Sequence, residues 1–351
     1  MNAILVKIVL SIVLTTVSFL SNAQIFGNGP KIDSMREFDD GKFQFATRFD
    51  LAWYHVVKWR DPSDPHVARV ADITGRARLY LPNDTRDKVP ALVLIHHSGG
   101  LYFPDGRARP NFPEWADALT DAGIAVVLLD VYSPRQMNRT ANQSRRYNWD
   151  AVFDAFQVRE LLQTHRKIDP NKIGIGGMSM GGTAALFAFD ERVAGAWSAD
   201  GRPFAFNIAV YPTCGNQFHA WKPAKAPLLI MNGELDEYAG VGACYELETK
   251  LKGLNANVAS ITYKGAYHSW DEDYSPRPAN DRSNRNCRWW MMDGGGWRSP
   301  SGELLDTDAK ATAYYNSCSI ADPALTMVGR NEEAFRKSKA DVVEFIKRVT
   351  R

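Results

Sequence analysis

The segment from Lys172 to Ala188 constrains the fold of this chain more than any other. An apolar run ending at Gly176 leads directly into Gly177-Met178-Ser179-Met180-Gly181, and a helix-forming stretch begins at Thr183. A strand that passes through such a turn into a helix holds the serine in a strained backbone and lifts its hydroxyl above the sheet. Glycines on either side let the neighbouring backbone approach closely. The pattern predicts a reactive hydroxyl on Ser179; the alternative is a glycine-rich turn with an idle serine.

Strand-like and helix-like stretches alternate on both sides of this segment. The predicted strands are Arg76–Leu81, Ala91–His96, Ile124–Leu129, Ile173–Gly176, Phe206–Tyr211, Pro227–Asn232 and Val258–Tyr263. The predicted helices are Pro113–Ala122, Trp149–His165, Thr183–Ala188, Gly242–Leu254 and Glu332–Arg348. This order predicts an α/β protein with a mainly parallel central sheet and helices on both faces. In such a sheet, functional sites lie at the carboxyl ends of the strands.

The first 23 of the 351 residues have the pattern of a secretory signal peptide. Lys7 supplies a positive charge, an apolar core follows, and Ser21-Asn22-Ala23 forms a small-residue cleavage site. The apolar core is shorter and richer in serine and threonine than a typical membrane span. An uncleaved anchor is the alternative. We expect a secreted or periplasmic chain that begins at Gln24 and has no membrane contact after cleavage.

The remaining residues, 24–351, are predicted to form a single domain. Residues 24–70 show no clear helix or strand periodicity, and we expect them to wrap the edge of that domain. Residues 271–325 break the alternation of strands and helices, and a structureless segment of that length is unusual in a compact domain. Three tryptophans and two cysteines within it predict an ordered, disulfide-pinned insertion.

The formal net charge of the chain is +2, and no run of lysine or arginine stands out. This charge distribution indicates neither a nucleic-acid partner nor an anionic membrane surface. The oligomeric state is not predicted by any pattern in the sequence.

All four cysteines lie in the C-terminal half of the chain: Cys214, Cys244, Cys287 and Cys318. An even number in an exported chain predicts two disulfides, and four cysteines allow three pairings. We favour the pairs that are neighbours in sequence, Cys214–Cys244 and Cys287–Cys318. Metal binding is the weaker alternative, because no C-x-x-C or paired His/Cys spacing occurs.

A serine hydroxyl becomes a useful nucleophile only when an oriented base accepts its proton. Asp236 follows a predicted strand in the loop where an acid is expected, and His268 follows the next strand. The order serine, acid, histidine matches the arrangement that goes with such a turn. We therefore predict Ser179 as nucleophile, His268 as base and Asp236 as its orienting acid. Glu234 is the competing acid.

Backbone amides must also stabilise the oxyanion of the tetrahedral intermediate. We expect one from Met180, which follows the nucleophile, and one from Ser98 in the loop after the strand Ala91–His96, with Gly99 as the next candidate. A metal site at the His96-His97 pair is the minor alternative, because adjacent histidines in a strand point to opposite faces.

Three more residues are candidates for contact with a substrate. Arg135 could bind a carboxylate at the mouth of the site, although a loop ion pair is the commoner role for such an arginine. Trp289 and Trp290, in the predicted insertion, could cap the pocket by stacking; simple burial is the alternative.

With these residues in view, the chain resembles the dienelactone hydrolase family of α/β-hydrolases. The resemblance rests on His96-His97-Ser98-Gly99-Gly100, Gly177-Met178-Ser179-Met180-Gly181, Tyr211-Pro212-Thr213-Cys214, Gly233-Glu234-Leu235-Asp236 and Gly265-Ala266-Tyr267-His268. It implies an α/β-hydrolase fold and a serine, acid and histidine triad. Similar exported members carry cysteines where Cys214 and Cys244 stand, which favours that pairing. The namesake enzymes use a cysteine nucleophile, whereas position 179 is serine, so a serine esterase of the wider family fits better.

Together these features predict an exported serine hydrolase that needs no cofactor or metal. Its expected substrates are carboxylic esters, small or attached to a polymer, cleaved through an acyl-enzyme. A peptidase or amidase with the same triad is one alternative. A non-catalytic exported binding protein that keeps the fold is the other. The acyl and alcohol groups of the substrate are not predicted by the sequence.

Overall fold

The computed structural model describes residues 29–36, 38–46, 74–83, 87–135, 144–279, 282–293 and 296–351. The predicted signal peptide lies outside the described residues, as does most of the stretch from 24 to 70 that was expected to wrap the domain edge. In the part of the chain that is described, no helix combines the length and the apolar character that crossing a membrane requires.

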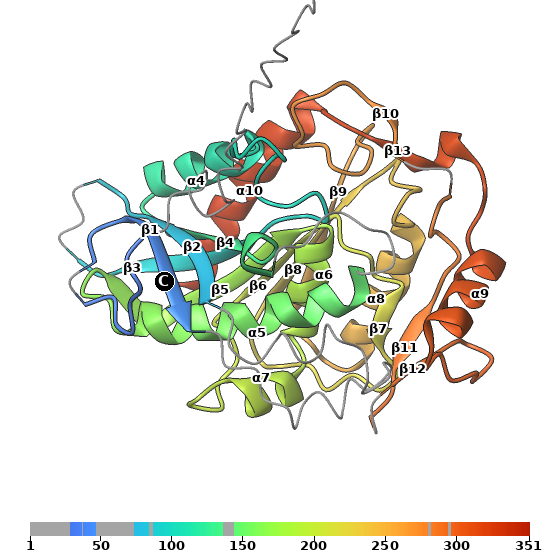
Figure 1. Cartoon of the computed structure of the whole chain (residues 1–351), viewed down its shortest axis with the longest axis horizontal. Coiled ribbons are helices and arrows are strands. Elements are labelled where there is room, and N and C mark those ends of the chain that lie inside the picture. The colour runs from blue at the N-terminus through green and yellow to red at the C-terminus, as the bar shows by residue number, and fades with distance from the viewer. Residues whose placement is uncertain are drawn as a thin grey trace, which may run out of the picture.

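An eight-stranded sheet runs through the molecule in the order β1-β2-β4-β3-β5-β6-β8-β9 (Figure 1). Its strands are β1 (Gly41–Ala46), β2 (Thr74–Tyr80), β3 (Val89–Ile95), β4 (Ala125–Asp130), β5 (Ile168–Met178), β6 (Asn207–Val210), β8 (Leu228–Gly233) and β9 (Val258–Tyr263). The pairs β1–β2 and β2–β4 are antiparallel, and every pair from β4 to β9 is parallel. The predicted mainly parallel sheet is therefore confirmed.

Helices cover both faces of this sheet, because its central strands are apolar on both sides. In β3, Ala91, Val93 and Ile95 belong to one buried cluster, whereas Leu92 and Leu94 belong to another. The first cluster includes residues of α5 (Ser144–Gln163), α6 (Met180–Phe187), α7 (Glu191–Trp197) and α8 (Val241–Gly253). The second includes residues of α4 (Asn111–Asp121) and α10 (Glu332–Val349). In Figure 1, α4 and α10 lie on the opposite side of the sheet from α5 and α7.

Helix α10 illustrates how local sequence fixes these elements. Asn331 caps its N-terminus by accepting a hydrogen bond from the amide of Ala334. Acidic residues occupy the first turn and basic residues the last turn, which complements the helix dipole. Phe335, Phe345 and Ile346 lie on one buried stripe and face the sheet.

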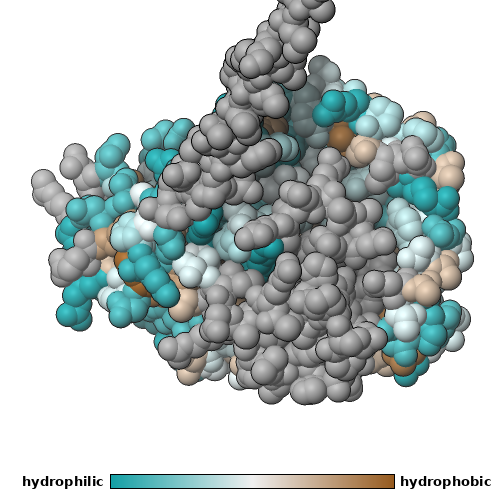
Figure 2. Space-filling model, viewed as in Figure 1, coloured by the Kyte–Doolittle hydropathy of each residue, from teal (hydrophilic) through white to brown (hydrophobic). Residues whose placement is uncertain are grey.

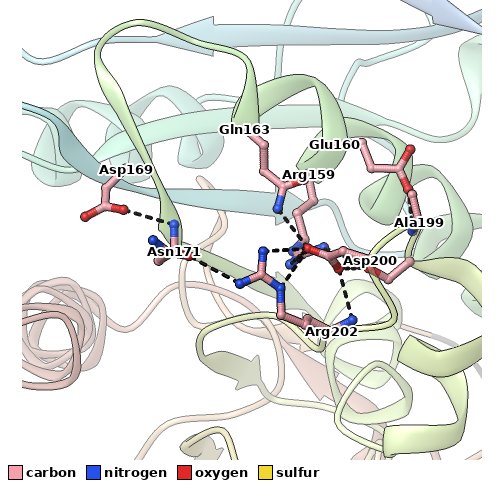
Figure 3. Close-up of polar contacts among 9 residues, drawn as sticks. Arg159, Glu160, Gln163, Asp169, Asn171, Ala199, Asp200 and Arg202 are labelled. Carbon is pink, nitrogen blue, oxygen red and sulfur yellow. Dashed lines mark hydrogen bonds and ion pairs between the residues drawn. The ribbon is translucent and has the colours of Figure 1, made fainter.

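A charged network fixes α5 to the loop between α7 and β6 (Figure 3). The Asp200 carboxylate accepts hydrogen bonds from Arg159 at 3.1 Å, from the Ser198 hydroxyl at 2.6 Å and from Arg202 at 2.9 Å. Partial burial raises the pKa of Asp200, but these hydrogen bonds outweigh it and hold the pKa well below its usual range. The network thus anchors the C-terminal half of α5 beside β5.

The residues between His268 and α10 form short elements rather than further strands of the main sheet. They are β10 (Arg277–Pro278), β11 (Trp289–Met291), β12 (Trp297–Arg298), α9 (Asp308–Cys318), η3 (Pro323–Thr326) and β13 (Met327–Val328). Strand β11 pairs with β12 and with β7 (Asn216–Phe218), and the three strands form a small second sheet.

Both disulfides favoured by the sequence are present. Cys214 is bonded to Cys244 on α8, and Cys287 is bonded to Cys318 at the end of α9. The first joins the loop after β6 to α8, and the second joins the segment before β11 to α9. The described part of 271–325 is therefore ordered and cross-linked.

Hydrophilic residues cover the left and right ends of the face shown in Figure 2. Among the described residues, the exposed large apolar side chains are Leu235, Tyr245 and Leu254. Single exposed apolar residues of this kind are normal on a protein surface.

Candidate active site

Ser179 lies at the sharp turn between β5 and α6. Its φ and ψ are 51° and −107°, a region that non-glycine residues rarely adopt. Hydrogen bonds hold this conformation: the Ser179 amide donates to the Val210 carbonyl at 2.8 Å, and the Ser179 carbonyl accepts from the Thr183 amide at 2.8 Å and the Thr183 hydroxyl at 3.1 Å. The strained geometry predicted for the motif is thus present.

The two glycines of the motif are needed because the turn packs tightly. A Cβ at Gly177 would lie 2.5 Å from the carbonyl carbon of Gly181. A Cβ at Gly181 would lie 2.4 Å from the carbonyl oxygen of Ile95, at the end of β3. A side chain at position 181 would therefore push the serine turn away from β3, and one at position 177 would collide with the backbone at the start of α6.

Three side chains from the ends of β5, β8 and β9 meet in one hydrogen-bonded row. The Ser179 Oγ lies 2.9 Å from His268 Nε2, and His268 Nδ1 lies 2.7 Å from Asp236 Oδ2. The second oxygen of Asp236 accepts a hydrogen bond from the Ala239 amide at 2.9 Å. With Nδ1–H donating to the carboxylate, Nε2 of the neutral ring is an acceptor for the serine hydroxyl.

The competing acid, Glu234, has a different partner. Its carboxylate accepts a hydrogen bond from the Gly265 amide at 2.8 Å, in the turn after β9. Glu234 therefore links the two loops, and Asp236 is the acid in contact with the histidine ring.

Two tyrosine rings flank the His268 imidazole. The ring centroid of Tyr211 lies 4.8 Å from that of His268, and the centroid of Tyr238 lies 4.9 Å away. Both tyrosines meet the imidazole at an interplanar angle of 63°. The backbone is fixed as well, because the Gly329 amide donates to the His268 carbonyl at 3.0 Å. The imidazole is thus restrained from several sides.

A buried carboxylate fixes Tyr211 in turn. The Tyr211 hydroxyl donates a short hydrogen bond to Asp271, which also accepts from the Trp115 indole at 2.9 Å and the Asn111 amide at 3.1 Å. Burial, followed by the nearby charge of Asp271, raises the pKa of Tyr211 well above its usual value. Tyr211 therefore remains protonated and continues to donate.

The sequence predicted the backbone amides of Met180 and Ser98 as donors to an oxyanion. Met180 is the first residue of α6, where N–H groups have no partner within the helix. Within the described residues, neither the Met180 amide nor the Ser98 amide has a hydrogen-bond acceptor. The Gly99 amide differs, because it donates to His97 Nδ1 at 2.8 Å. Ser98 is thus a better candidate donor than Gly99.

Protein atoms lie close to every ring nitrogen of the two adjacent histidines. His96 Nδ1 lies 2.7 Å from the His97 carbonyl, and the Val131 amide donates to His96 Nε2 at 3.2 Å. His97 Nδ1 accepts from Gly99, and its Nε2 lies 2.7 Å from Glu272 Oε1. Burial lowers the pKa of His96 to about 3. These contacts support a packing role for the pair over the alternative of a metal site.

Of the two alternatives for Arg135, the structure contains the ion pair. Its guanidinium is buried and donates to both oxygens of Asp154, at 2.6 and 2.9 Å. It also donates to the Val131 carbonyl at 2.9 Å. Because these donors are occupied inside the protein, Arg135 braces the loop after β4 rather than facing a substrate.

The two tryptophans lie in the small second sheet, on β11. Trp289 is buried and its ring centroid lies 4.7 Å from that of Tyr314 on α9. Trp290 is half-buried beside the His219 ring, with centroids 5.3 Å apart. Burial of the appended segment, the alternative to pocket stacking, accounts for Trp289.

The structure adds residues that the sequence did not single out: Asp271, Glu272 and Tyr238. Asp271 and Glu272 follow His268 by three and four residues, and both are fully or almost fully buried. Two successive acidic residues so close to a candidate base were the signal available in the sequence. Their partners, on α4 and in the loop after β3, could not be identified without the fold.

The sequence of this chain is similar to the model of one protein family and to other known proteins. Residues 76–292 match the sequence model of the dienelactone hydrolase family. "Putative carboxymethylenebutenolidase" from Aquifex aeolicus is 22% identical over 218 residues, which cover 58% of this chain and 85% of that protein. "Putative hydrolase YtaP" from Bacillus subtilis is 26% identical over 129 residues, 32% of this chain. That match spans less than half of YtaP, 43% of its length.

Among solved structures, a "Putative Dienelactone Hydrolase" from Klebsiella pneumoniae aligns with a TM-score of 0.44 and 14% identity. The alignment covers 57% of this chain and 85% of that one. The similarity is too low to add to what the sequence match establishes.

Proposed function

Because the chain belongs to the dienelactone hydrolase family, we propose that it is a serine hydrolase that cleaves carboxylic esters through an acyl-enzyme. The observation that carries this proposal is the row of hydrogen bonds from Ser179 through His268 to Asp236. These groups follow β5, β8 and β9, which are parallel strands of one sheet, so their carboxyl ends lie at the same edge.

The geometry supports a two-step reaction. In the first step, Ser179 Oγ attacks the ester carbonyl carbon while His268 Nε2 takes the hydroxyl proton. Asp236 stabilises the resulting imidazolium through its hydrogen bond to Nδ1. As the tetrahedral intermediate collapses, the bond to the alcohol oxygen breaks and His268 gives its proton to the departing alcohol.

In the second step, His268 removes a proton from a water molecule, which attacks the acyl-enzyme. Collapse of this second intermediate releases the acid and returns the proton to Ser179. The amides of Met180 and Ser98 are the proposed donors to the oxyanion in both steps. Loss of one such donor typically lowers kcat by about 10²- to 10³-fold.

The identity of the proposed nucleophile helps to define the class of ester that is cleaved. One relative is named as a carboxymethylenebutenolidase, but the namesake lactone hydrolases of the family use cysteine where Ser179 stands. A serine has a harder, less nucleophilic oxygen and depends on the adjacent base for activation. We therefore propose ordinary carboxylic esters, rather than that lactone, as the substrate class.

We further propose that the enzyme works outside the cytoplasm. Two disulfides are typical of proteins that fold in an oxidising compartment. The signal-peptide pattern of the first 23 residues supports the same location.

The proposal is tested by labelling the purified protein, with its disulfides formed, with a fluorophosphonate and locating the adduct by peptide mass spectrometry. We expect the adduct on Ser179. The Ser179→Ala variant should lose at least about 10³-fold in kcat on p-nitrophenyl butyrate. Ser317→Ala, at an exposed serine on α9, is the matched control and should keep full activity.

A second substrate separates the esterase from an amidase. We expect the corresponding p-nitroanilide to be turned over far more slowly than the ester. Full ester turnover by Ser179→Ala would reject the proposed nucleophile. A folded protein that neither labels nor hydrolyses the ester would favour the non-catalytic binding protein instead.

A further inference from the structure

A buried contact joins the two loops on either side of the proposed catalytic centre. We define the oxyanion loop as residues 96–100 and the histidine loop as residues 268–272. His97 Nε2, in the oxyanion loop, lies 2.7 Å from Glu272 Oε1, at the end of the histidine loop. Both side chains are almost completely buried, with exposures of 7% and 3%. A carboxylate buried this deeply is retained only where it has polar partners.

The other side of the His97 ring holds the backbone of its own loop. The Gly99 amide donates to His97 Nδ1 at 2.8 Å, so Nδ1 carries no proton and Nε2 is the nitrogen that bears one. Nε2, the nitrogen that bears the proton, is therefore the one that lies beside the Glu272 carboxylate. Through this tautomer, the imidazole transmits the position of Glu272 to the amide next to Ser98.

Arg109 makes a parallel connection to the same glycine. Its Nη2 donates to the Gly99 carbonyl at 3.1 Å, and its Nη1 lies 3.9 Å from Glu272 Oε2. Gly99 is therefore held at both its N–H and its C=O by side chains that contact the one carboxylate. The fit is close, because a Cβ at Gly99 would lie 2.5 Å from His97 Cε1.

We propose that Glu272 is a positioning residue that, through His97 and Arg109, aims the Ser98 amide at the oxyanion. This inference rests on the proposed serine esterase function. Glu272 follows the proposed base, His268, by four residues in the same loop. The contact between the histidine loop and the oxyanion loop therefore fixes the positions of the base and of the oxyanion donor together. Displacing the histidine loop disrupts both positions.

The main test is the Glu272→Ala variant, assayed at a temperature well below its Tm. We expect kcat to fall by about 10- to 100-fold, because a misplaced donor loses transition-state stabilisation, while KM changes by less than about 3-fold. The Ki of a trifluoromethyl ketone, whose tetrahedral adduct places an oxyanion in the same position, should rise by a similar factor. A purely structural role would lower Tm without moving the Ki.

Two further variants refine the result. Glu272→Gln keeps an acceptor oxygen for His97 and should retain more of kcat than Glu272→Ala. The double variant His97→Ala/Glu272→Ala should lose little more than the worse single variant, because the two residues act as one unit. Glu344→Ala, an exposed carboxylate on α10, is the matched control and should change neither kcat nor Ki.

Failure of this inference differs from failure of the proposed function. Full turnover by Ser179→Ala would reject the function itself. If Ser179→Ala is inactive and the Glu272 variants keep kcat and Ki within about 2-fold of the wild type, only the positioning role is wrong. Should Glu272→Ala not fold, Gly99→Ala is the deciding variant, because its Cβ would lie 2.5 Å from His97 Cε1 and so displace the ring without changing residue 272 itself. Unchanged kcat and Ki in that variant would likewise overturn the inference.

Discussion

At the scale of single residues, the strained turn at Ser179 depends on the absence of side chains at its neighbours. The turn is held by the hydrogen bonds to Val210 and from Thr183, which compensate for the positive φ. Tight approach to β3 is possible only because position 181 is glycine, and glycine at position 177 leaves room for the backbone of Gly181. The strained geometry is therefore a property of packing around the serine as much as of the serine itself.

Gly181→Ala should destabilise the protein by about 1 to 3 kcal/mol, because its Cβ would lie 2.4 Å from the Ile95 carbonyl oxygen. Ester turnover should fall as well, since the serine turn must shift. Urea unfolding and p-nitrophenyl butyrate hydrolysis measure the two effects. The control is Gly195→Ala on α7, where a Cβ meets nothing within 4 Å. The free energy of unfolding of this helical variant should be unchanged or rise by up to about 1 kcal/mol. Equal stability of the two variants would contradict the prediction.

His96 predicts how stability depends on pH. Burial lowers its pKa to about 3 in the folded protein, whereas the unfolded chain has the ordinary value of 6.5. As pH falls below about 6.5, the unfolded state binds a proton that the folded state does not bind, so stability falls. The expected loss is about 1.4 kcal/mol per pH unit until the folded pKa is reached.

The measurement compares the wild type with His96→Asn, which cannot titrate at this position. We expect the variant to be less stable at pH 7, because it loses polar contacts with His97 or Val131. Its free energy of unfolding should nevertheless decline less steeply between pH 6 and pH 4. Parallel declines in the two proteins would show that His96 does not control the acid sensitivity.

At the scale of helices and strands, the sequence predicted elements with strong apolar patterns. Strand β9 was predicted with its observed limits, Val258–Tyr263, and β8 was displaced by one residue at each end. Strand β1 was missed because only two of its residues, Phe43 and Phe45, are buried. Helix α9 was missed because it lacks an apolar stripe; the Thr307 cap and the Cys287–Cys318 disulfide define its ends instead.

The candidate site could be predicted from the sequence only where its residues follow strands with a strong apolar pattern. Ser179, Asp236 and His268 each follow a predictable strand, so their positions in the sheet could be inferred from chain order. The contact of His97 with Glu272, and that of Asp271 with Trp115, join loops that are far apart in the chain. No periodic pattern encodes such a pairing, and only the folded topology brings these side chains together.

Asp200 links two elements and gives a prediction of its own. Asp200→Asn should lower the Tm at pH 7, because Arg159 and Arg202 lose their charged partner. Since the pKa of Asp200 is lowered on folding, its contribution is present above the unfolded value of about 3.9 and declines as pH falls below it. The difference in Tm between wild type and variant should therefore be larger at pH 7 than at pH 2.5. A difference that does not change with pH would contradict this account.

At the scale of the whole molecule, the segment after His268 braces the loop that carries the acid. The Ser283 hydroxyl donates to the Glu237 carbonyl, and the Asn284 amide donates to the Tyr238 carbonyl at 3.0 Å. Arg285 forms an ion pair with Glu237 at 2.8 Å. Cys287, a few residues later, ties this brace to α9. The appended segment is therefore part of the support of the site.

Removing the second disulfide should weaken this support. In the chain-entropy model, a cross-link between two cysteines 31 positions apart in sequence, Cys287 and Cys318, contributes about 3 to 4 kcal/mol. Cys287→Ser/Cys318→Ser should lower the free energy of unfolding by that order and reduce kcat through a looser acid loop. Denaturant unfolding and ester kinetics measure the two effects. Unchanged kcat in a folded but destabilised variant would limit the brace to a role in stability.

The hydrogen bond from Gly329 to the His268 carbonyl also has a consequence for biosynthesis. Nucleophile, acid and base emerge from the ribosome in that order, and the backbone that fixes the base follows some sixty residues later. A nascent chain that ends before Gly329 carries all three side chains but lacks this anchor. The position of the His268 backbone thus depends on a residue that is synthesised well after the histidine itself.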